Sequence, residues 1–173
     1  MTLGGQAATK SMMAAMTPGA GHQKLGAMVG IFDVKLKAWS SPSTPPAEFW
    51  GTSVNTWVLG ERFVQMMFSA ISEGEFISAI SYMGYDNVSR KYVVTSMDTG
   101  GTGMEWFTGT LDAPGKSLLF KATIDDPVTG KPSPAEMRIR LTDDSGDNVT
   151  ELWSEGPDGK MFEMMELVYT RKK

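Results

Sequence analysis

The chain has 173 residues, a length that suits one domain with a sizeable core. Its net charge is −4 with dispersed Lys and Arg, which argues against a nucleic-acid binder because phosphate neutralisation supplies most non-specific affinity. The absence of cysteine excludes disulfides and Cys-based zinc sites, and it fits the cytoplasmic location that we expect. No stretch approaches the ~20 apolar residues of a membrane-spanning helix.

The first segment, residues 1–20, is weakly patterned and is predicted to be a flexible tail that ends at the breaker Pro18-Gly19. A weak amphipathic helix over residues 9–16 is the alternative. Polar and glycine residues interrupt any apolar run here, so the sequence predicts no secretory signal. We therefore predict a tail over 1–20 and a single domain over 21–173.

The next ten residues, 21–30, have a helical pattern. Leu25, Met28 and Val29 are spaced at i, i+3 and i+4 and would share one helix face. Gly30 is a natural stop. The sequence predicts one or two helical turns directly before the first strand.

From Phe32 onward the pattern changes to a period of two, with apolar even positions and charged odd positions as far as Lys37. This alternation is typical of a strand with one buried and one solvated face. Further strand-like runs follow at regular spacing, separated by turns rich in Gly, Pro, Asp and Asn. The predicted strands cover roughly 32–38, 49–59, 62–71, 76–84, 90–98, 103–111, 117–124, 135–142, 148–155 and 161–170.

Ten short strands without a long crossover helix predict an all-β antiparallel meander. Closing such a sheet into a barrel removes its exposed edges, and a ten-stranded barrel is wide enough to enclose a ligand cavity. A two-sheet sandwich is the alternative. Several strands, such as 63–68, are apolar on both faces, and an exposed apolar outer face would favour a homodimer.

Short landmarks also recur along the chain in an order and spacing that are specific as a set. They are HQKL at 22–25, VGIFDV at 29–34, WVLG at 57–60, RF at 62–63, GYDN at 84–87, KY at 91–92, GT at 109–110, DPVTGK at 126–131, GPDGK at 156–160, MME at 164–166 and YTRK at 169–172.

On these landmarks the chain resembles the bacterial domain-of-unknown-function 1579 family over about residues 22–172. The family usually has a tryptophan where this chain has Phe32, a change that keeps an aromatic ring but loses an indole N–H. The resemblance implies a lipocalin-like, calycin-type β-barrel with a short N-terminal helix. It implies no activity, since the family is named for the lack of one.

The chain has one histidine, His22, which lies before the first strand. A single histidine cannot build a multi-His metal site, and we expect His22 to serve at the start of the helix. We predict no metal site and no cofactor.

Three carboxylates, Asp98, Glu105 and Glu166, lie within apolar strands. A buried carboxylate needs a partner, and Arg138 or Arg140 is the expected one. Contact with a ligand is the second interpretation, and general-base catalysis by Asp98 or Glu105 is the third. The sequence does not predict an enzyme.

Aromatic and methionine side chains within the predicted strands favour a wide, adaptable apolar pocket for a small hydrophobic or amphipathic molecule. Plain core packing is the alternative, in which case the barrel is filled and self-associates. The predicted ligand-binding residues are Phe32, Leu36, Trp57, Met67, Tyr82, Tyr92, Asp98, Trp106 and Glu166.

Overall fold

The computed structural model describes residues 3–72, 74–126, 129–141, 146–156 and 158–173. Two helices and one 3₁₀ turn precede the strands: α1 (Leu3–Met16), α2 (Ala20–Leu25) and η1 (Gly26–Met28). The strands are β1 (Gly30–Ala38), β2 (Ala47–Val58), β3 (Phe63–Ser72), β4 (Glu75–Asp86), β5 (Lys91–Asp98), β6 (Glu105–Leu111), β7 (Ser117–Asp125), β8 (Pro132–Leu141), β9 (Asn148–Glu155) and β10 (Met161–Arg171).

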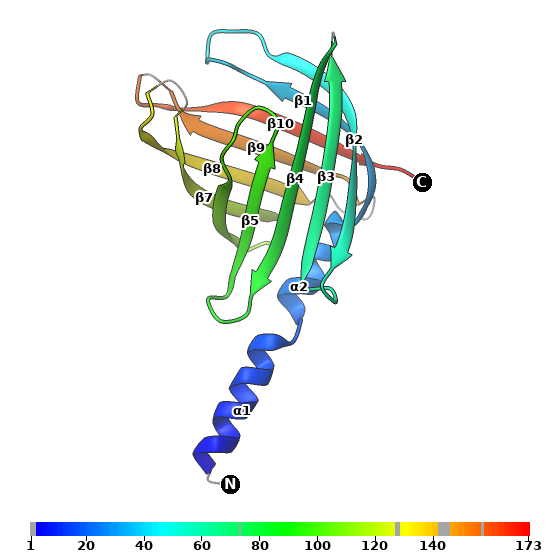
Figure 1. The fold of residues 1–173 in the computed structure, drawn as a ribbon, viewed down its shortest axis with the longest axis vertical. Coiled ribbons are helices and arrows are strands. Elements are labelled where there is room, and N and C mark those ends of the chain that lie inside the picture. The colour runs from blue at the N-terminus through cyan, green and yellow to red at the C-terminus, as the bar shows by residue number, and fades with distance from the viewer. Residues whose placement is uncertain (1–2, 73, 127–128, 142–145, 157) are drawn as a thin grey trace.

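The strands form a closed antiparallel barrel in the order β1-β10-β9-β8-β7-β6-β5-β4-β3-β2 (Figure 1). Nine ladders join strands that are consecutive in the chain, and the tenth joins β1 to β10. In this closing ladder Phe32 lies opposite Arg171 and Ala38 lies opposite Met165. The predicted all-β meander and its closure are therefore confirmed, and no strand of the described chain is left with an open edge.

Glycines occur where strands approach each other most closely. A Cβ on Gly51 would collide with the carbonyl oxygen of Ser69 on β3, and a Cβ on Gly109 would collide with the carbonyl oxygen of Leu119 on β7. Glycine inside a strand marks such sites of close backbone approach and bending. We infer that these two residues allow the sheet to curl tightly enough to close.

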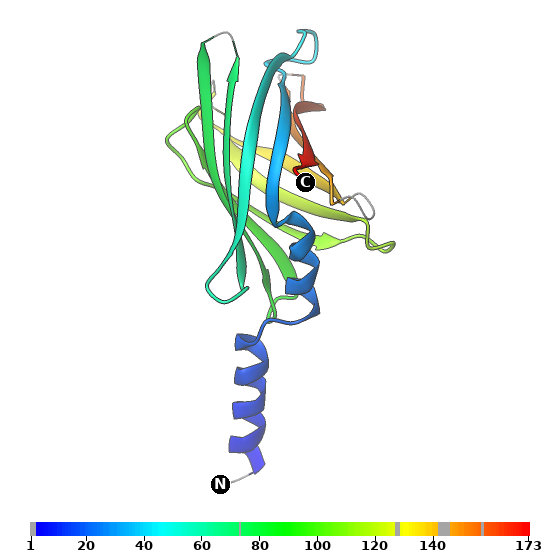
Figure 2. The same cartoon turned by 90° about the vertical axis from the view of Figure 1, so that its right-hand side faces the viewer.

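One end of the barrel, which we call the α2 end, is plugged by α2 and η1 (Figures 1 and 2). Leu25 and Met28 are fully buried there. The guanidinium of Arg171 donates to the carbonyl oxygens of Val29 (2.6 Å) and Ala27 (2.9 Å), which ties η1 to the end of β10.

His22 lies in the first turn of α2, in agreement with the helix-start role expected from the sequence. Its Nδ1 accepts a hydrogen bond from the backbone N–H of Gly19 at 3.1 Å, and its ring meets Tyr85 edge-on with centroids 5.7 Å apart. Burial and the nearby charge of Arg62 lower the pKa of the imidazole. The only histidine is thus part of the plug.

Helix α1 projects from the barrel beyond the α2 end (Figure 2). It is longer than the helix over 9–16 that the sequence offers as an alternative to a flexible tail. Its last turn is held by the loops of the barrel: Asn87 donates to the carbonyl oxygen of Ala14 (3.0 Å) and Arg62 donates to that of Met16 (2.9 Å). The division into a tail over 1–20 and a domain over 21–173 stays a prediction. None of the described helices has the length and apolar character needed to cross a membrane.

Candidate functional site

The interior of the barrel encloses a cavity of about 220 Å³. Its walls are inward-facing side chains of every strand except β7, together with Met28 of the plug. The lining consists of Met28, Leu36, Ser53, Met66, Phe68, Ile77, Ala79, Ser81, Met83, Val94, Ser96, Asp98, Glu105, Phe107, Met137, Ile139, Thr150, Leu152, Met164, Met165, Leu167 and Tyr169.

Most of this lining is apolar, and six of its side chains are methionine. Methionine is flexible and polarisable, so it adapts to ligands of varied shape. Inside this wall the hydroxyls of Ser81 and Ser96 bond to each other at 2.9 Å. They satisfy each other without a ligand, and either can turn toward one.

The two carboxylates of the lining lie where β5 ends and β6 begins, which is opposite the α2 end. Asp98 is exposed, so the cavity reaches solvent here, and we call this the open end. Asp98 Oδ1 accepts a hydrogen bond from the backbone N–H of Gly100 at 2.7 Å. Burial and the neighbouring charge of Asp98 raise the pKa of the Glu105 carboxyl.

Tyr169 on β10 supplies a further polar group. Its side chain is only 9% exposed and packs edge-to-face on Phe32, with ring centroids 5.9 Å apart. Burial raises the pKa of its phenol. Among the described residues its hydroxyl has no hydrogen-bond partner, so it is available to a molecule in the cavity.

Of the nine residues predicted to bind a ligand, Leu36 and Asp98 line the cavity. Phe32, Tyr92 and Trp57 point inward but pack in the core instead. Tyr92 and Trp57 join the cluster around Leu25 and Met28, whereas Phe32 belongs to the cluster formed by β1, β2, β3 and β10. They close the cavity without lining it, because the plug fills that end of the barrel.

The other four predicted residues lie on the outer face. Met67 and Trp106 are 51% and 66% exposed. Tyr82 accepts a hydrogen bond from Gln65 Nε2 at 2.7 Å, and Glu166 pairs with Lys37 at 2.9 Å.

The predicted lining thus differs from the observed one by a single position on four strands. Met66, Ser81, Glu105 and Met165 lie inside, each next in sequence to one of the four. Neighbouring residues of a strand face opposite sides of the sheet, and alternation cannot assign the faces where both carry apolar residues.

The arginines expected to neutralise an inner carboxylate are also on the outer face. Arg140 pairs with Glu151 at 2.7 Å, and Arg138 lies 3.9 Å from the same carboxylate. Glu151 is nearly buried beneath them. The expected Arg–carboxylate pairing therefore occurs at Glu151, and Asp98 and Glu105 have no cation partner among the described residues.

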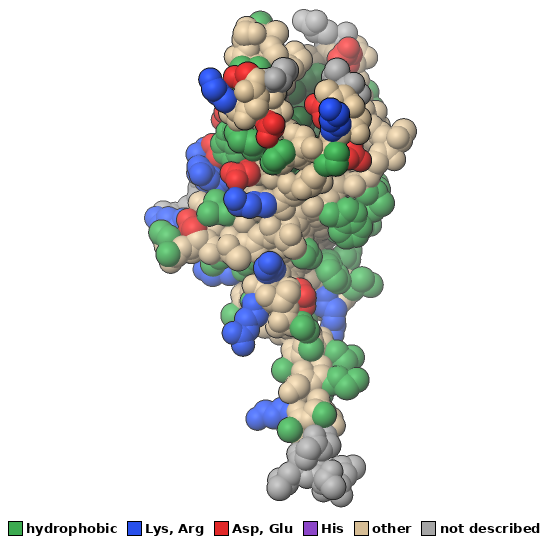
Figure 3. Space-filling model, turned by 90° about the vertical axis from the view of Figure 1, so that its left-hand side faces the viewer, with side chains coloured by type: hydrophobic (Ala, Val, Ile, Leu, Met, Phe, Trp, Pro, Cys, Tyr) green, Lys and Arg blue, Asp and Glu red, His purple; other side chains and the backbone are tan. Residues whose placement is uncertain are grey.

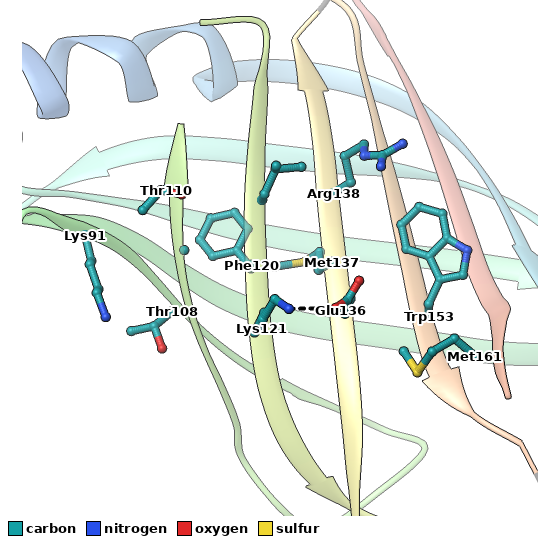
Figure 4. Close-up of a pocket in the computed structure, with 12 residues that line it drawn as sticks. Lys91, Thr108, Thr110, Phe120, Lys121, Glu136, Met137, Arg138, Trp153 and Met161 are labelled. Atoms are coloured by element: carbon teal, nitrogen blue, oxygen red, sulfur yellow. Dashed lines mark ion pairs between the residues drawn. The ribbon is translucent and has the colours of Figure 1, made fainter. Parts of the chain in front are cut away.

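A larger hollow of about 610 Å³ lies on the outer face of β5 to β10 (Figure 4). Its charged side chains largely satisfy one another: Lys121 pairs with Glu136 at 3.0 Å, and the Arg138 guanidinium lies over the ring of Trp153 at 5.5 Å. The interior cavity combines enclosure with unpaired polar groups, so we take it as the candidate site. No group of three or more potential metal ligands occurs among the described residues.

Comparison with known proteins places the chain in context. The family described as "Protein of unknown function (DUF1579)" matches residues 17–171. The crystal structure of Rv2717c from M. tuberculosis superposes with a TM-score of 0.65 at 16% sequence identity, and covers 91% of this chain and 100% of that chain. At this identity the similarity shows the fold alone. No curated protein matches the sequence.

Proposed function

Because the chain belongs to the DUF1579 family, whose function is unknown, we propose from its own geometry that it binds a small, largely apolar molecule inside the barrel. The observation that carries this proposal is the methionine-rich cavity that opens at one end beside polar groups. Apolar walls with a few convergent polar groups are the usual form of a small-molecule site. This would be a lipocalin-like mode of binding.

The size of the cavity limits the ligand. An engineered cavity of about 150 Å³ holds benzene, and sites for drug-sized ligands start at about 300 Å³. A cavity of about 220 Å³ lies between these values. We therefore expect a ligand with one ring, or a short chain of about ten non-hydrogen atoms.

Native mass spectrometry of the gently purified protein, titrated with 2-phenylethanol, tests the proposal. We expect a one-to-one adduct that is lost in Ala79→Leu, since the added side chain would occupy the cavity that Ala79 lines. The matched control Ser69→Leu changes a residue of the outer face. An adduct that survives Ala79→Leu, or no adduct at all with the wild type, would contradict binding in the interior.

Self-association is a second candidate because the outer face of β2 to β4 carries exposed apolar side chains in register. Trp50, Ile71 and Phe76 lie side by side across the three strands, and Val54 lies opposite Met67 further along. Figure 3 shows hydrophobic side chains gathered along one flank of the barrel and on the projecting helix. Exposed apolar patches of this kind mark interaction surfaces.

Light scattering over a concentration series tests this second candidate. We expect a dimer that Phe76→Glu shifts to monomer, since a charge would then have to be desolvated in the contact. Leu59→Glu, which changes an exposed apolar residue of the β2–β3 turn, is the matched control. A monomer at all concentrations in the wild type would refute it.

A further inference from the structure

We infer that the cavity selects organic amines, with the ammonium group held by Asp98 and Glu105 at the open end and the apolar body inside the barrel. This inference rests on the proposed function and names the chemical class of its ligand. It follows from the charges of the lining, from an unpaired phenol, and from the size of the cavity.

The charged side chains of the lining are all negative. Asp98 and Glu105 are its two ionisable carboxylates, and the described lining contains no Lys, Arg or His. Neither carboxylate forms an ion pair with any described residue. The open end of the cavity therefore presents negative charge at the edge of an apolar space, which attracts cations and repels carboxylates.

Glu105 is the more buried of the two acids and has the stronger need for a partner. Its side chain is half-buried, and the charge of Asp98 lies nearby. A carboxylate in this position is stabilised by a hydrogen-bonded cation, and an ammonium group has three donors to share between two carboxylates. On the outer face, in contrast, Glu166 and Glu151 form ion pairs with Lys37 and Arg140.

Tyr169 is an independent sign that the interior is built for a ligand. Its side chain is only 9% exposed and lines the cavity, and its hydroxyl has no hydrogen-bond partner in the described chain. A hydroxyl placed in this way can bond to a molecule that occupies the cavity. Tyr169 lies on β10, whereas the acids lie on β5 and β6, so the polar groups of the cavity come from different parts of its wall.

The apolar wall between these groups fits a hydrocarbon body. Met66, Phe68 and Phe107 line it together with the remaining methionines. An arylalkylamine of about ten non-hydrogen atoms matches the volume by comparison with benzene in its smaller cavity. Such an amine is protonated at neutral pH, as lysine is.

Three probes of similar size separate charge from shape: phenethylamine, 2-phenylethanol and 3-phenylpropanoate. Isothermal titration calorimetry at pH 7 measures each on the full chain. We expect phenethylamine to bind about tenfold tighter than the alcohol, the range that charge-assisted hydrogen bonds provide, and the carboxylate to bind more weakly than both.

The variant Asp98→Asn/Glu105→Gln should remove the preference and leave the affinity for the alcohol within about twofold. Glu75→Gln, an exposed carboxylate at the same end that does not line the cavity, should leave the preference intact. Thermal unfolding of each variant verifies that it is folded.

The outcomes separate the two proposals. If the alcohol binds and the amine binds no tighter, amine selection is refuted while interior binding stands. A preference for the amine that persists in the double variant also refutes the role of the two carboxylates. If none of the three probes binds the folded wild type, both proposals fall.

Discussion

The two ends of the barrel are built on opposite principles. At the α2 end Leu25 and Met28 are fully buried, and hydrogen bonds from Arg171 fasten the plug. At the open end Asp98 is exposed, Glu105 lacks a cation, and the space between the strands is not filled. One end contributes stability, and the other retains unpaired polar groups next to an empty volume.

In a barrel without a catalytic motif, the open end is therefore the part of the molecule in which we expect function. The contribution of well-packed, hydrogen-bonded residues to stability is sufficient to explain why they are there. The Tyr169 hydroxyl and the half-buried Glu105 carboxylate line the cavity and have no hydrogen-bond or ion-pair partner in the described chain. Their position beside the cavity is better explained by a bound molecule than by folding.

Removing the plug side chain should have the largest effect. Leu25→Ala should lower the free energy of unfolding by about 2–5 kcal/mol, since it leaves a cavity in a fully packed site. Ile77→Ala, at a half-buried residue lining the existing cavity, should cost less than about 2 kcal/mol. Urea unfolding measures both, and equal losses at the two sites would show that the ends are packed alike.

Filling the cavity at the open end should make the packing of the two ends alike. Ala79→Leu should weaken binding of 2-phenylethanol by more than about tenfold, or 1.4 kcal/mol, because the leucine takes the ligand's place. The free energy of unfolding should change by less than about 1.5 kcal/mol, because the added methyl groups enter empty space. A large loss of stability would mean that the cavity is smaller than the structure shows.

A smaller effect on the free energy of unfolding is expected when the pH is varied, because of Glu105 at the open end. Burial and Asp98 raise the pKa of Glu105 in the folded state, so the charged form is penalised by folding. This residue's contribution to stability is then fully present below its unfolded-state pKa and is lost as pH rises through the folded-state pKa.

The free energy of unfolding of Glu105→Gln should therefore exceed that of the wild type by up to about 1 kcal/mol at neutral pH, and the difference should vanish at acid pH. Urea unfolding from pH 4 to pH 8 measures it, with the exposed Glu75→Gln as control. A difference that grows as pH falls would contradict the assigned direction.

The smallest effect is expected beyond the α2 end. Asn87→Ala removes the side-chain donor that bonds to the carbonyl oxygens of Ala14 and Thr17 at the end of α1. An isolated helix of this length is marginal in water, so the helix content measured by circular dichroism should fall. The free energy of unfolding of the barrel should change by less than about 0.5 kcal/mol, and a larger change would show that α1 stabilises the barrel.

The sequence predicts the architecture well because short-range signals specify it. Turn residues punctuate the chain, and the alternation from Phe32 to Lys37 matches β1, in which Phe32, Val34 and Leu36 are buried. The helical spacing of Leu25 and Met28 likewise identifies the residues that plug the barrel. The length of α1 is not predictable in this way, since its last turn is held by Asn87 and Arg62 from distant loops.

The lining of the cavity is less predictable from sequence. Where a strand is apolar on both faces, as at Met66-Met67, only the register against neighbouring strands decides which side chain faces inward. At Glu105 and Trp106 the usual rule that apolar side chains face inward gives the wrong answer, since the acid faces the interior and the indole faces solvent. Tyr169 begins the landmark YTRK, but nothing in the sequence shows that its hydroxyl is unpaired, which is visible only in three dimensions.

The ladder between β1 and β10 has a consequence for the order of folding. Every other ladder joins consecutive strands, so it closes a short loop of chain, whereas pairing Phe32 with Arg171 closes nearly the whole domain. Loop-closure entropy and contact order make such a pairing the slowest to form. We expect the meander to assemble first as an open sheet that wraps round and locks at this seam, so that slow formation of the seam would briefly expose two sheet edges and the barrel interior to other molecules.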